Sequence, residues 1–435
     1  MIHDAPRRSD APRLSIVIPT FGREESLQRL LNALARQQGA PPFDVIVVLD
    51  GVPEASIGAG RREWPFPLRV VEQPSRGAAA ARNAGAQLAQ SEVLLFLDDD
   101  VEPAERVIRA HAEFHASRRR GIGAGDLAPV PTETGFISTA LTGWWETMCG
   151  QLRDPRHRFT FRDLLTGHCS VTRATFEQLG RFDESLLCHE DFEFGYRAIE
   201  AGATIRFVPG SDARHHDTTT LEKVLRRKRD EGIADVQLVA KHPSLLRALP
   251  LGRPVPGGIC RRAFDAALRG ARRDAVFGGG LVRLLHVLER ASMRDKWRVV
   301  LDAAMAYAYW RGAVEYAGGT GALGAIRARP DPPQSAPVVI DLRAGLTQAE
   351  EQIDRERPTA VRIVLGDAEV GIVLPVAGAE PFRGEHLRPV LLHQLAGPLA
   401  AAASRVGILP SVLHGEAAAR PQRKDVVAAG AARVA

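Results

Sequence analysis

The stretch Leu14-Ser-Ile-Val-Ile-Pro-Thr20 decides the fold, because it is a short β-branched apolar run that a proline ends. Such a run predicts a buried strand. The next apolar residues are leucines spaced at i, i+3, i+4 and i+7, which predict a helix with one apolar face. These leucines are Leu27, Leu30, Leu31 and Leu34.

The alternation of strand and helix continues along the first hundred residues. Further strands are expected over residues 43–49, 68–71 and 93–97, and a helix over 77–88. Near-continuous apolar strands are typical of strands buried on both faces, so we predict an α/β fold: an open, mostly parallel sheet flanked by helices. Ligands of such sheets lie outside the carboxyl ends of the strands. Thr20, Asp50 and residues 98–100 each follow a strand and should therefore meet in one crevice.

The sequence after residue 100 predicts further secondary structure and a division into domains. Residues 121–165, with the Trp144-Trp145 pair, are expected to be rich in loops, and a strand is expected over 204–208. Helices are expected over 171–181, 190–201, 219–242 and much of 243–325. We divide the chain into a catalytic domain at 12–235, a helical extension at 236–328, a Pro-rich linker at 329–337, a small α+β accessory region at 338–413 and a disordered tail at 414–435.

Composition excludes several classes of protein. The 435 residues are 45% hydrophobic and 25% charged, which is ordinary for globular domains and excludes a mainly disordered or collagen-like chain. The net charge of +5 is too mild to predict nucleic-acid binding. There is no apolar run long enough to predict a membrane span. The cysteines show no metal spacing, which favours reduced thiols and a cytoplasmic location. They are Cys149, Cys169, Cys188 and Cys260.

Three consecutive carboxylates, Asp98, Asp99 and Asp100, follow the fourth strand. Adjacent carboxylates repel one another unless a cation neutralises some of them, and oxygen ligands suit Mg²⁺ or Mn²⁺. Strand alternation should point Asp98 and Asp100 in similar directions and Asp99 in the opposite one. The alternative is a solvated loop whose aspartates cap the next helix.

Four segments, given at the end of this paragraph in chain order, resemble the family 2 glycosyltransferases, which are inverting enzymes of the GT-A fold. The resemblance covers roughly residues 12–235. The resemblance implies that Thr20 and Asp50 hold the nucleobase and ribose of a sugar donor, that Asp98 contacts the nucleoside, and that Asp100 binds the metal that bridges the diphosphate. The segments are Ser15-Ile-Val-Ile-Pro-Thr-Phe-Gly-Arg23, residues 45–51, Gly77-Ala-Ala-Ala-Ala-Arg-Asn-Ala-Gly85 and Leu95-Phe-Leu-Asp-Asp-Asp-Val-Glu-Pro103.

Gly180-Arg-Phe-Asp-Glu184 and His189-Glu-Asp-Phe-Glu-Phe-Gly-Tyr-Arg197 extend the resemblance. It implies that Asp191 is the general base that takes the proton of the acceptor hydroxyl, and we place Glu190 with the substrate-binding residues. The alternative is that both acidic residues only favour a helix N-terminus. Arg181 stands where the family prefers a second glycine.

Four further groups keep alternative interpretations. One of His215 and His216, with His215 first, is implied as a metal ligand, against a surface role. We expect Arg76 to contact the nucleotide. Arg82 and Asn83 have two interpretations: they bind the nucleotide, or they only pack against or cap the helix that they begin. The basic run 226–229 has three interpretations: it forms a solvated face of a helix, it contacts the donor's diphosphate, or it contacts anionic lipid head groups. Trp144 and Trp145 stack on an acceptor sugar or belong to the core.

The sequence therefore predicts an inverting, metal-dependent glycosyltransferase. It would move a sugar from a nucleoside-diphosphate donor to the hydroxyl of a glycan, a lipid-linked sugar or a small molecule, with Mg²⁺ or Mn²⁺ as cofactor and a peripheral membrane contact. The alternative from another class is a non-catalytic nucleotide-sugar-binding module of a glycan-assembly complex. A third interpretation makes 338–413 an interaction domain that sets the partner or the membrane.

Overall fold

The computed structural model describes residues 13–56, 58, 63–118, 120–130, 135–154, 157–253, 266–329 and 336–407. These residues form two compact units. Unit 1 holds the described residues up to Arg329 together with Val376–Glu380, and unit 2 holds the described parts of 336–375 and 381–407. Cys260, most of the Pro-rich linker and the tail 414–435 lie outside the described residues.

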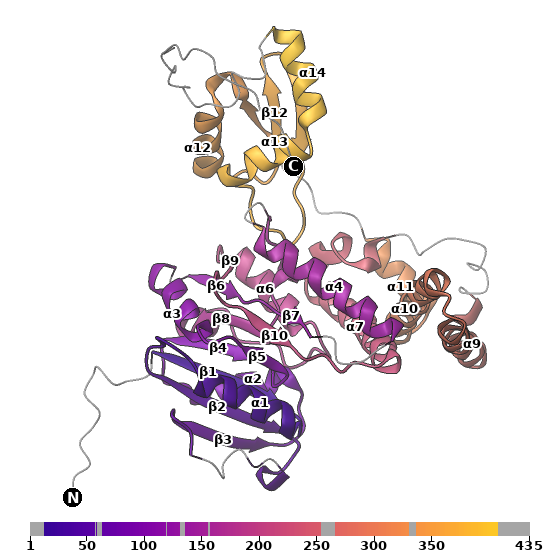
Figure 1. Ribbon diagram of the computed structural model, residues 1–435. Helices are drawn as coiled ribbons and strands as arrows, with labels where there is room; N and C mark the ends of the chain where they lie inside the picture. The colour runs from indigo at the N-terminus through magenta and orange to yellow at the C-terminus, as the bar shows by residue number, and fades with distance from the viewer. Residues whose placement is uncertain are drawn as a thin grey trace, which may run out of the picture. The chain divides into compact units, whose positions relative to one another are not determined.

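A seven-stranded sheet is the centre of unit 1 (Figure 1). The first four strands in the chain pair in parallel, as predicted, and β8 runs antiparallel between β4 and β6. The order is β3-β2-β1-β4-β8-β6-β9. The strands are β1 (Leu14–Thr20), β2 (Phe43–Asp50), β3 (Leu68–Gln73), β4 (Val93–Leu97), β6 (Gly121–Ala124), β8 (His168–Thr172) and β9 (Thr204–Phe207).

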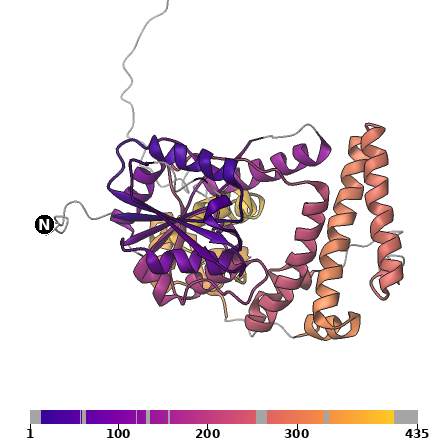
Figure 2. The same ribbon diagram turned by 90° about the horizontal axis from the view of Figure 1, so that it is seen from below.

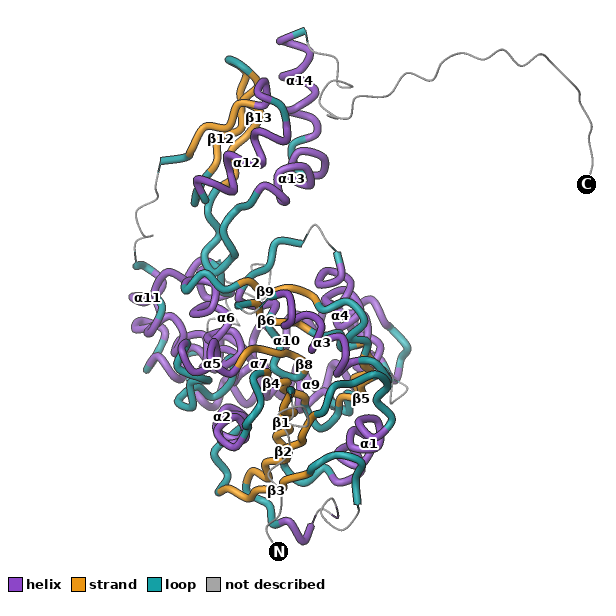
Figure 3. Tube along the Cα trace, turned by 90° about the vertical axis from the view of Figure 1, so that its left-hand side faces the viewer, coloured by secondary structure: helices purple, strands orange, loops and turns teal. Residues whose placement is uncertain are grey.

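Alternation along β1 supplies two separate layers of core. Ile16 and Ile18 pack with the leucines of α1 (Glu24–Ala35), whereas Val17 packs with the alanines of α2 (Ala78–Leu88). Figure 3 shows α1 and α2 on opposite sides of the sheet. The α2 helix approaches closely, since a Cβ at Gly85 would lie 2.4 Å from Val17 Cγ1. This is the α/β arrangement that the apolar strands predict.

A second, three-stranded sheet stands next to the carboxyl end of β4. Its order is β5-β10-β7, and His215 is the register partner of both Val101 and Pro129. The small sheet therefore brings residues after 210 beside the three consecutive aspartates. Its strands are β5 (Val101–Pro103), β7 (Ala128–Pro129) and β10 (Ala213–His215).

The prediction that residues 121–165 are rich in loops is wrong. An 18-residue helix, α4 (Phe136–Arg153), occupies much of this stretch and turns Trp145, Cys149 and Leu152 into the core at a helical spacing. Neighbouring glycines and threonines hide this short apolar stripe, so tertiary burial decides the element. An unpredicted helix, α3 (Val107–Ser117), precedes it.

The remaining helices of unit 1 lie where helices are expected. Gly312 lets α7 and α10 cross closely, because any residue with a Cβ at this position would place it 1.9 Å from the carbonyl oxygen of Arg229. Figure 2 shows α9 and α10 as two long neighbouring helices in the orange part of the chain. Among the described residues, no helix combines the length and the apolar character needed to cross a bilayer. The helices are α5 (Arg173–Gln178), α6 (Glu190–Glu200), α7 (Leu221–Lys241), α9 (Ala271–Arg290), α10 (Arg294–Ala317) and α11 (Thr320–Arg327).

Unit 2 is a small α+β unit. Its sheet has the order β11-β12-β13, and Gly366, in the turn between β12 and β13, adopts the left-handed conformation that the turn requires (φ +66°). The elements are β11 (Val338–Asp341), α12 (Leu346–Glu356), β12 (Val361–Leu365), β13 (Ala368–Val373), α13 (Leu387–His393) and α14 (Ala396–Val406).

Five residues within the predicted accessory region, Val376–Glu380, belong to unit 1. Ala379 forms an antiparallel bridge with Thr160, and Phe161 N donates to Gly378 O at 2.7 Å. The Glu380 carboxylate is buried and forms an ion pair with Arg206 at 2.7 Å. We call this segment the strap.

Candidate active site

Thr20 and the consecutive aspartates meet at the carboxyl ends of β1 and β4. Thr20 Oγ1 donates to Asp99 Oδ2 at 2.5 Å, and Asp99 is fully buried. Burial raises the pKa of Asp99 to about 6, although Arg23 opposes this effect. The topology of the parallel sheet accounts for this convergence, as the sequence predicts.

Arg23 is a site residue that sequence reasoning missed as such. Its guanidinium pairs with Asp99 and donates to Asp100 Oδ2 at 2.6 Å, and its side chain is half exposed. It is the last residue of the first resemblance segment, and that position is the signal that could have found it. Arg23 neutralises part of the charge that the sequence analysis assigned to a metal ion.

Asp50 lies at the end of β2 and is held by the loop that leads into α2. Its carboxylate accepts hydrogen bonds from Arg76 N at 2.8 Å, Gly77 N at 2.9 Å and Gln73 Nε2 at 2.8 Å. The Arg76 side chain points elsewhere, to Glu184 at 2.5 Å, and is 60% exposed. Asp50 therefore orders this loop, and the Arg76 guanidinium lies at the surface.

Arg82 connects the two halves of the candidate site. Its buried guanidinium donates to Asp98 Oδ1 at 2.6 Å and to Glu190 Oε1 at 2.7 Å. Burial alone would raise the pKa of Asp98, but the charge of Arg82 lowers it below its ordinary value. The end of β4 and the start of α6 are thus joined by one cation, which goes beyond packing or capping.

Asn83 bonds a turn that is distant in the chain and does not cap its own helix. Its side-chain amide donates to Phe182 O at 2.9 Å and to Glu184 Oε1 at 3.0 Å, and its oxygen accepts from Phe182 N at 3.1 Å. Asn83 therefore fastens the turn that precedes α6. Arg181, where a glycine was expected, adopts a positive φ of 63° in that turn.

Asp191 lies in the first turn of α6, after His189 in a left-handed conformation (φ 64°). Burial raises the pKa of Asp191 to about 6, the charge of Glu190 adds to this, and the charges of His189 and Arg82 oppose it. Because Arg82 bonds Asp98 directly and acts electrostatically on Asp191, the three residues belong to one charge network.

Of the two candidate histidines, His215 faces the aspartates. His215 Nε2 lies 3.6 Å from Asp100 Oδ1, whereas His216 Nε2 bonds Glu102 at 2.8 Å. Asp100 Oδ1 and His215 Nδ1 are buried and lack a hydrogen-bond partner among the described residues. Within the same residues, no group of three His, Cys, Asp or Glu side chains could hold a metal ion.

The basic run on α7 pairs with acidic residues of the helices. Lys228 Nζ lies 2.7 Å from Glu231, and Arg229 lies 2.6 Å from Glu315 of α10. These pairs favour the interpretation of a solvated face. The tryptophans differ: Trp144 is half exposed, whereas Trp145 is buried with its ring centroid 4.5 Å from that of His215.

A buried histidine cluster supports the sheet behind the aspartates and had no sequence signal. His168, the register partner of Leu97, lies 3.0 Å from His111 through their Nε2 atoms. Ser170 Oγ bonds both His111 and His115. Burial lowers the pKa of His168 and of His115 to about 4, so the cluster is neutral at pH 7.

Comparisons with known families and proteins show what the chain is similar to. The model of glycosyl transferase family 2 matches residues 15–180. The chain is 30% identical over 279 residues to the validoxylamine A glucosyltransferase of Streptomyces hygroscopicus subsp. limoneus, an alignment that covers 55% of this chain and 59% of the relative. It is 26% identical over 329 residues to the pre-mycofactocin glycosyltransferase of Mycobacterium tuberculosis (strain CDC 1551 / Oshkosh), covering 71% and 67%.

Among solved structures, the mannosyltransferase PcManGT from Pyrobaculum calidifontis, in complex with GDP-Man and Mn²⁺, aligns with a TM-score of 0.48 and 16% identity. The alignment covers 72% of this chain and 89% of that structure. Of the validoxylamine A glucosyltransferase named above, the chain spans about three fifths of the length.

Proposed function

Residues 15–180 belong to glycosyl transferase family 2, and from this premise we propose that the chain transfers a sugar from a nucleoside-diphosphate donor to an acceptor hydroxyl with inversion. The matched segment includes Thr20, Asp50 and the three consecutive aspartates. Asp191 lies beyond it, so its role depends on the geometry of the site. The names of the relatives, a glucosyltransferase and a glycosyltransferase, support the reaction class.

The observation that carries the proposal is the pair of ion pairs that the buried Arg82 guanidinium forms with the partly exposed Asp98 and with Glu190. It fastens the start of α6 to the carboxyl end of β4. A donor bound at Asp98 would therefore lie beside Asp191. An inverting transfer needs one base near the acceptor hydroxyl, and Asp191, a partly buried carboxylate in the first turn of α6, would be that base.

The donor side would be formed by residues at the ends of β1, β2 and β4. We propose that Thr20, Asp50 and Asp98 hold the nucleoside, with Arg76 and Glu190 at the edge of the donor. Asp50 keeps the loop before α2 in place through two backbone amides. Arg76 is exposed and has one ion-pair partner in Glu184, so it can turn to a phosphate at low cost.

Asp100 and His215 fit a divalent cation. Asp100 Oδ1 is a buried acceptor without a hydrogen-bond partner in the described part of the chain, and His215 Nε2 lies 3.6 Å from it. Mg²⁺ is usually held by one or two carboxylates together with substrate phosphates, so the lack of a third described protein ligand agrees with a donor-dependent site. When bound, Mg²⁺ or Mn²⁺ would neutralise the charge of the departing diphosphate.

The proposed chemistry of the chain's own residues is a direct displacement. Asp191 takes the proton of the acceptor hydroxyl while the hydroxyl oxygen attacks the anomeric carbon. The bond from that carbon to the diphosphate breaks, and its electron pair leaves with the diphosphate. The raised pKa of Asp191 suits a base, since a carboxylate of higher pKa holds the proton more strongly.

A panel of nucleoside-diphosphate sugars tests the proposal. The chain is incubated with each donor and Mn²⁺, and the release of nucleoside diphosphate is measured. We expect at least one donor to be consumed, Asp191→Asn to bind that donor with turnover lowered by roughly 10²- to 10⁴-fold, and EDTA to abolish release. Donor binding by the wild-type chain without any turnover would favour a non-catalytic binding module instead.

A cytoplasmic location and a peripheral membrane contact remain proposals. The helices α9 and α10 carry exposed apolar side chains, among them Val276, Val287 and Val299. Basic residues on α7 would add attraction to anionic lipid. Co-sedimentation with anionic and neutral vesicles tests this contact, and equal recovery of the chain with both would count against it.

A further inference from the structure

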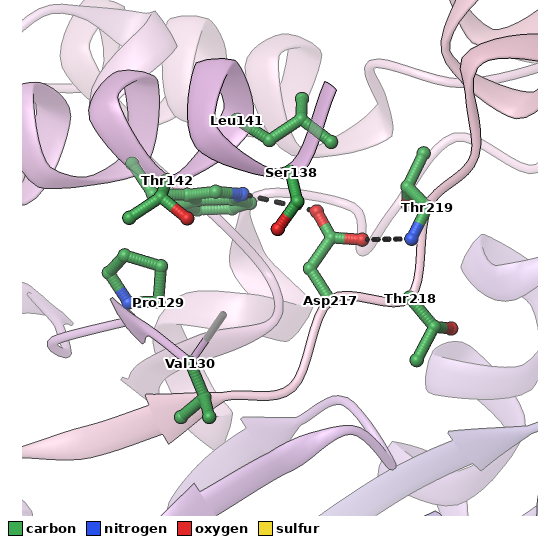
Figure 4. A pocket seen from close by; sticks show the side chains of 9 residues that line it. Pro129, Val130, Ser138, Leu141, Thr142, Asp217, Thr218 and Thr219 are labelled. Atoms are coloured by element: carbon green, nitrogen blue, oxygen red, sulfur yellow. Dashed lines mark hydrogen bonds between the residues drawn. The ribbon is translucent and has the colours of Figure 1, made fainter. Parts of the chain in front are cut away.

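A pocket lies beside the candidate site, between α4 and the segment that joins β10 to α7 (Figure 4). It spans about 340 Å³ of space, which includes open solvent at its mouth. Its lining mixes hydroxyl groups, one carboxylate and apolar surface. The lining residues are Pro129, Val130, Ser138, Leu141, Thr142, Trp145, Asp217, Thr218 and Thr219.

The carboxylate of Asp217 is held in a fixed direction. Thr219 N donates to Oδ1 at 2.8 Å, and Trp145 Nε1 lies 3.4 Å from Oδ2, as the dashed lines of Figure 4 mark. Donors on both sides keep the charge at the wall of the pocket. A fixed carboxylate accepts hydrogen bonds from hydroxyl groups and repels phosphates and other anions.

The remaining lining suits a ring that carries both hydroxyl groups and C–H faces. Ser138, Thr142 and Thr218 offer hydroxyls that donate and accept hydrogen bonds. Leu141 and the Trp145 ring supply apolar surface between them. Ligand pockets hold small molecules through a few polar groups placed on mainly apolar walls. The lining therefore favours an uncharged polyhydroxylated ring.

The position of the pocket relates it to the proposed reaction. Pro129 at its wall is the register partner of His215, which in turn pairs with Val101, the neighbour of Asp100. Neighbouring strands lie about 4.8 Å apart, so the two steps from β7 through β10 to β5 place Pro129 about 10 Å from β5. Trp145 lines the pocket and contacts His215 as well. The pocket thus lies next to the proposed donor site and is separate from it.

We propose that this pocket is the acceptor subsite and that the part of the acceptor bound there is an uncharged polyhydroxylated ring. The inference rests on the proposed function, because an acceptor has meaning only if a sugar is transferred. It narrows the acceptor class that the sequence left open: a ring with a phosphate or carboxylate at this point would meet Asp217.

Saturation-transfer NMR on the full chain tests the subsite with two probes, myo-inositol and myo-inositol 1-phosphate, each with and without UDP or GDP and Mg²⁺. Thr142→Val removes one hydroxyl at nearly constant volume. Thr147→Val is the matched control, because Thr147 is exposed on the same helix and bonds only the backbone at Gly143.

We expect binding of myo-inositol to wild type and to Thr147→Val, and roughly fivefold weaker binding to Thr142→Val, the effect of one lost hydrogen bond. The phosphorylated probe should bind to wild type at least tenfold more weakly than myo-inositol, and Asp217→Asn should narrow that difference. Equal binding of both probes to wild type, equal binding of myo-inositol to Thr142→Val and wild type, or no binding of myo-inositol would overturn the proposal.

Hydrolysis of the nucleotide-sugar by water, measured without any acceptor, separates this proposal from the proposed function. Thr142→Val should leave hydrolysis unchanged while it weakens probe binding. A chain that neither binds nor hydrolyses any nucleotide-sugar would refute the proposed function, whatever the probes do. Normal hydrolysis together with the overturning probe results would refute the acceptor subsite alone.

Discussion

Asp191 should give the activity an acid limb near pH 6. Burial raises its pKa to about 6 from an ordinary 3.8, and Glu190 is the next cause. A base must be deprotonated to act, so kcat/KM should fall about tenfold for each pH unit below the pKa. At pH 5 roughly one tenth of the maximum should remain, whereas a carboxyl with an ordinary pKa would keep more than about nine tenths.

Glu190→Gln separates Asp191 from other carboxyls. It removes one negative charge beside Asp191 and leaves Arg82 to interact with the remaining carboxylates, so the acid limb should move to lower pH. Glu184→Gln is the matched control, because Glu184 pairs with Arg76 and is not among the causes of the Asp191 shift. Asp191→Asn should lower kcat by roughly 10²- to 10⁴-fold while donor binding persists.

The assay is the initial rate of nucleoside-diphosphate release between pH 4.5 and 8, with circular dichroism at each pH to confirm that the chain is folded. Asp99 also has a pKa raised to about 6, but Glu190 is not among the causes of that shift. A limb that stays in place in Glu190→Gln would therefore assign it to another group. A wild-type limb near pH 4 would refute the reasoning about Asp191.

Three stability predictions concern the surroundings of the site. Arg82→Met leaves the partly exposed carboxylates of Asp98 and Glu190 without their buried cation and should cost about 2–3 kcal/mol in urea unfolding; a loss below about 1 kcal/mol would contradict the ion-pair account. His168 and His115 have a pKa of about 4 in the folded chain, so below pH 6.5 the unfolded chain binds protons that the folded chain does not. Each should lower the unfolding free energy by about 2 kcal/mol between pH 7 and 5, and an unchanged urea midpoint would show that the cluster is not neutral. Glu380→Gln should cost about 2 kcal/mol by weakening the strap's charged bond to Arg206, and a melting temperature equal to that of wild type would show that the strap adds nothing to unit 1.

The strap also changes how the accessory region can be removed. A deletion of 338–413 would take Val376–Glu380 with it, and Phe161, which bonds Gly378, packs against α6 below Asp191: a Cβ at Gly195 would lie 2.8 Å from Phe161 O. Loss of activity after that deletion would not report on partner or membrane choice. Substitutions confined to the surface of unit 2 separate the two effects.

Much of unit 1 could be read from the sequence because its signals are local. Apolar runs and leucine spacing predicted β1, β2, β3, β4 and α1, since burial on both faces of a parallel sheet leaves a continuous apolar pattern. Motif order placed Thr20 and the aspartates at one edge, because parallel strands end together. The helix α4 was not predicted, because three core residues among glycines and threonines give too weak a helical pattern of apolar residues.

The tertiary structure alone decided which charges meet. No spacing relates Arg82 to Glu190, Arg23 to Asp100, or Glu380 to Arg206, because each pair is distant in the chain and its energy depends on burial and direction. The same holds for the neutral histidine cluster, which exists because three helix and strand faces exclude water together. The sequence by itself determined the strands and the residue types at their ends. Folding determined which of those side chains share one low-dielectric site, since electrostatic interactions act through space and not along the chain.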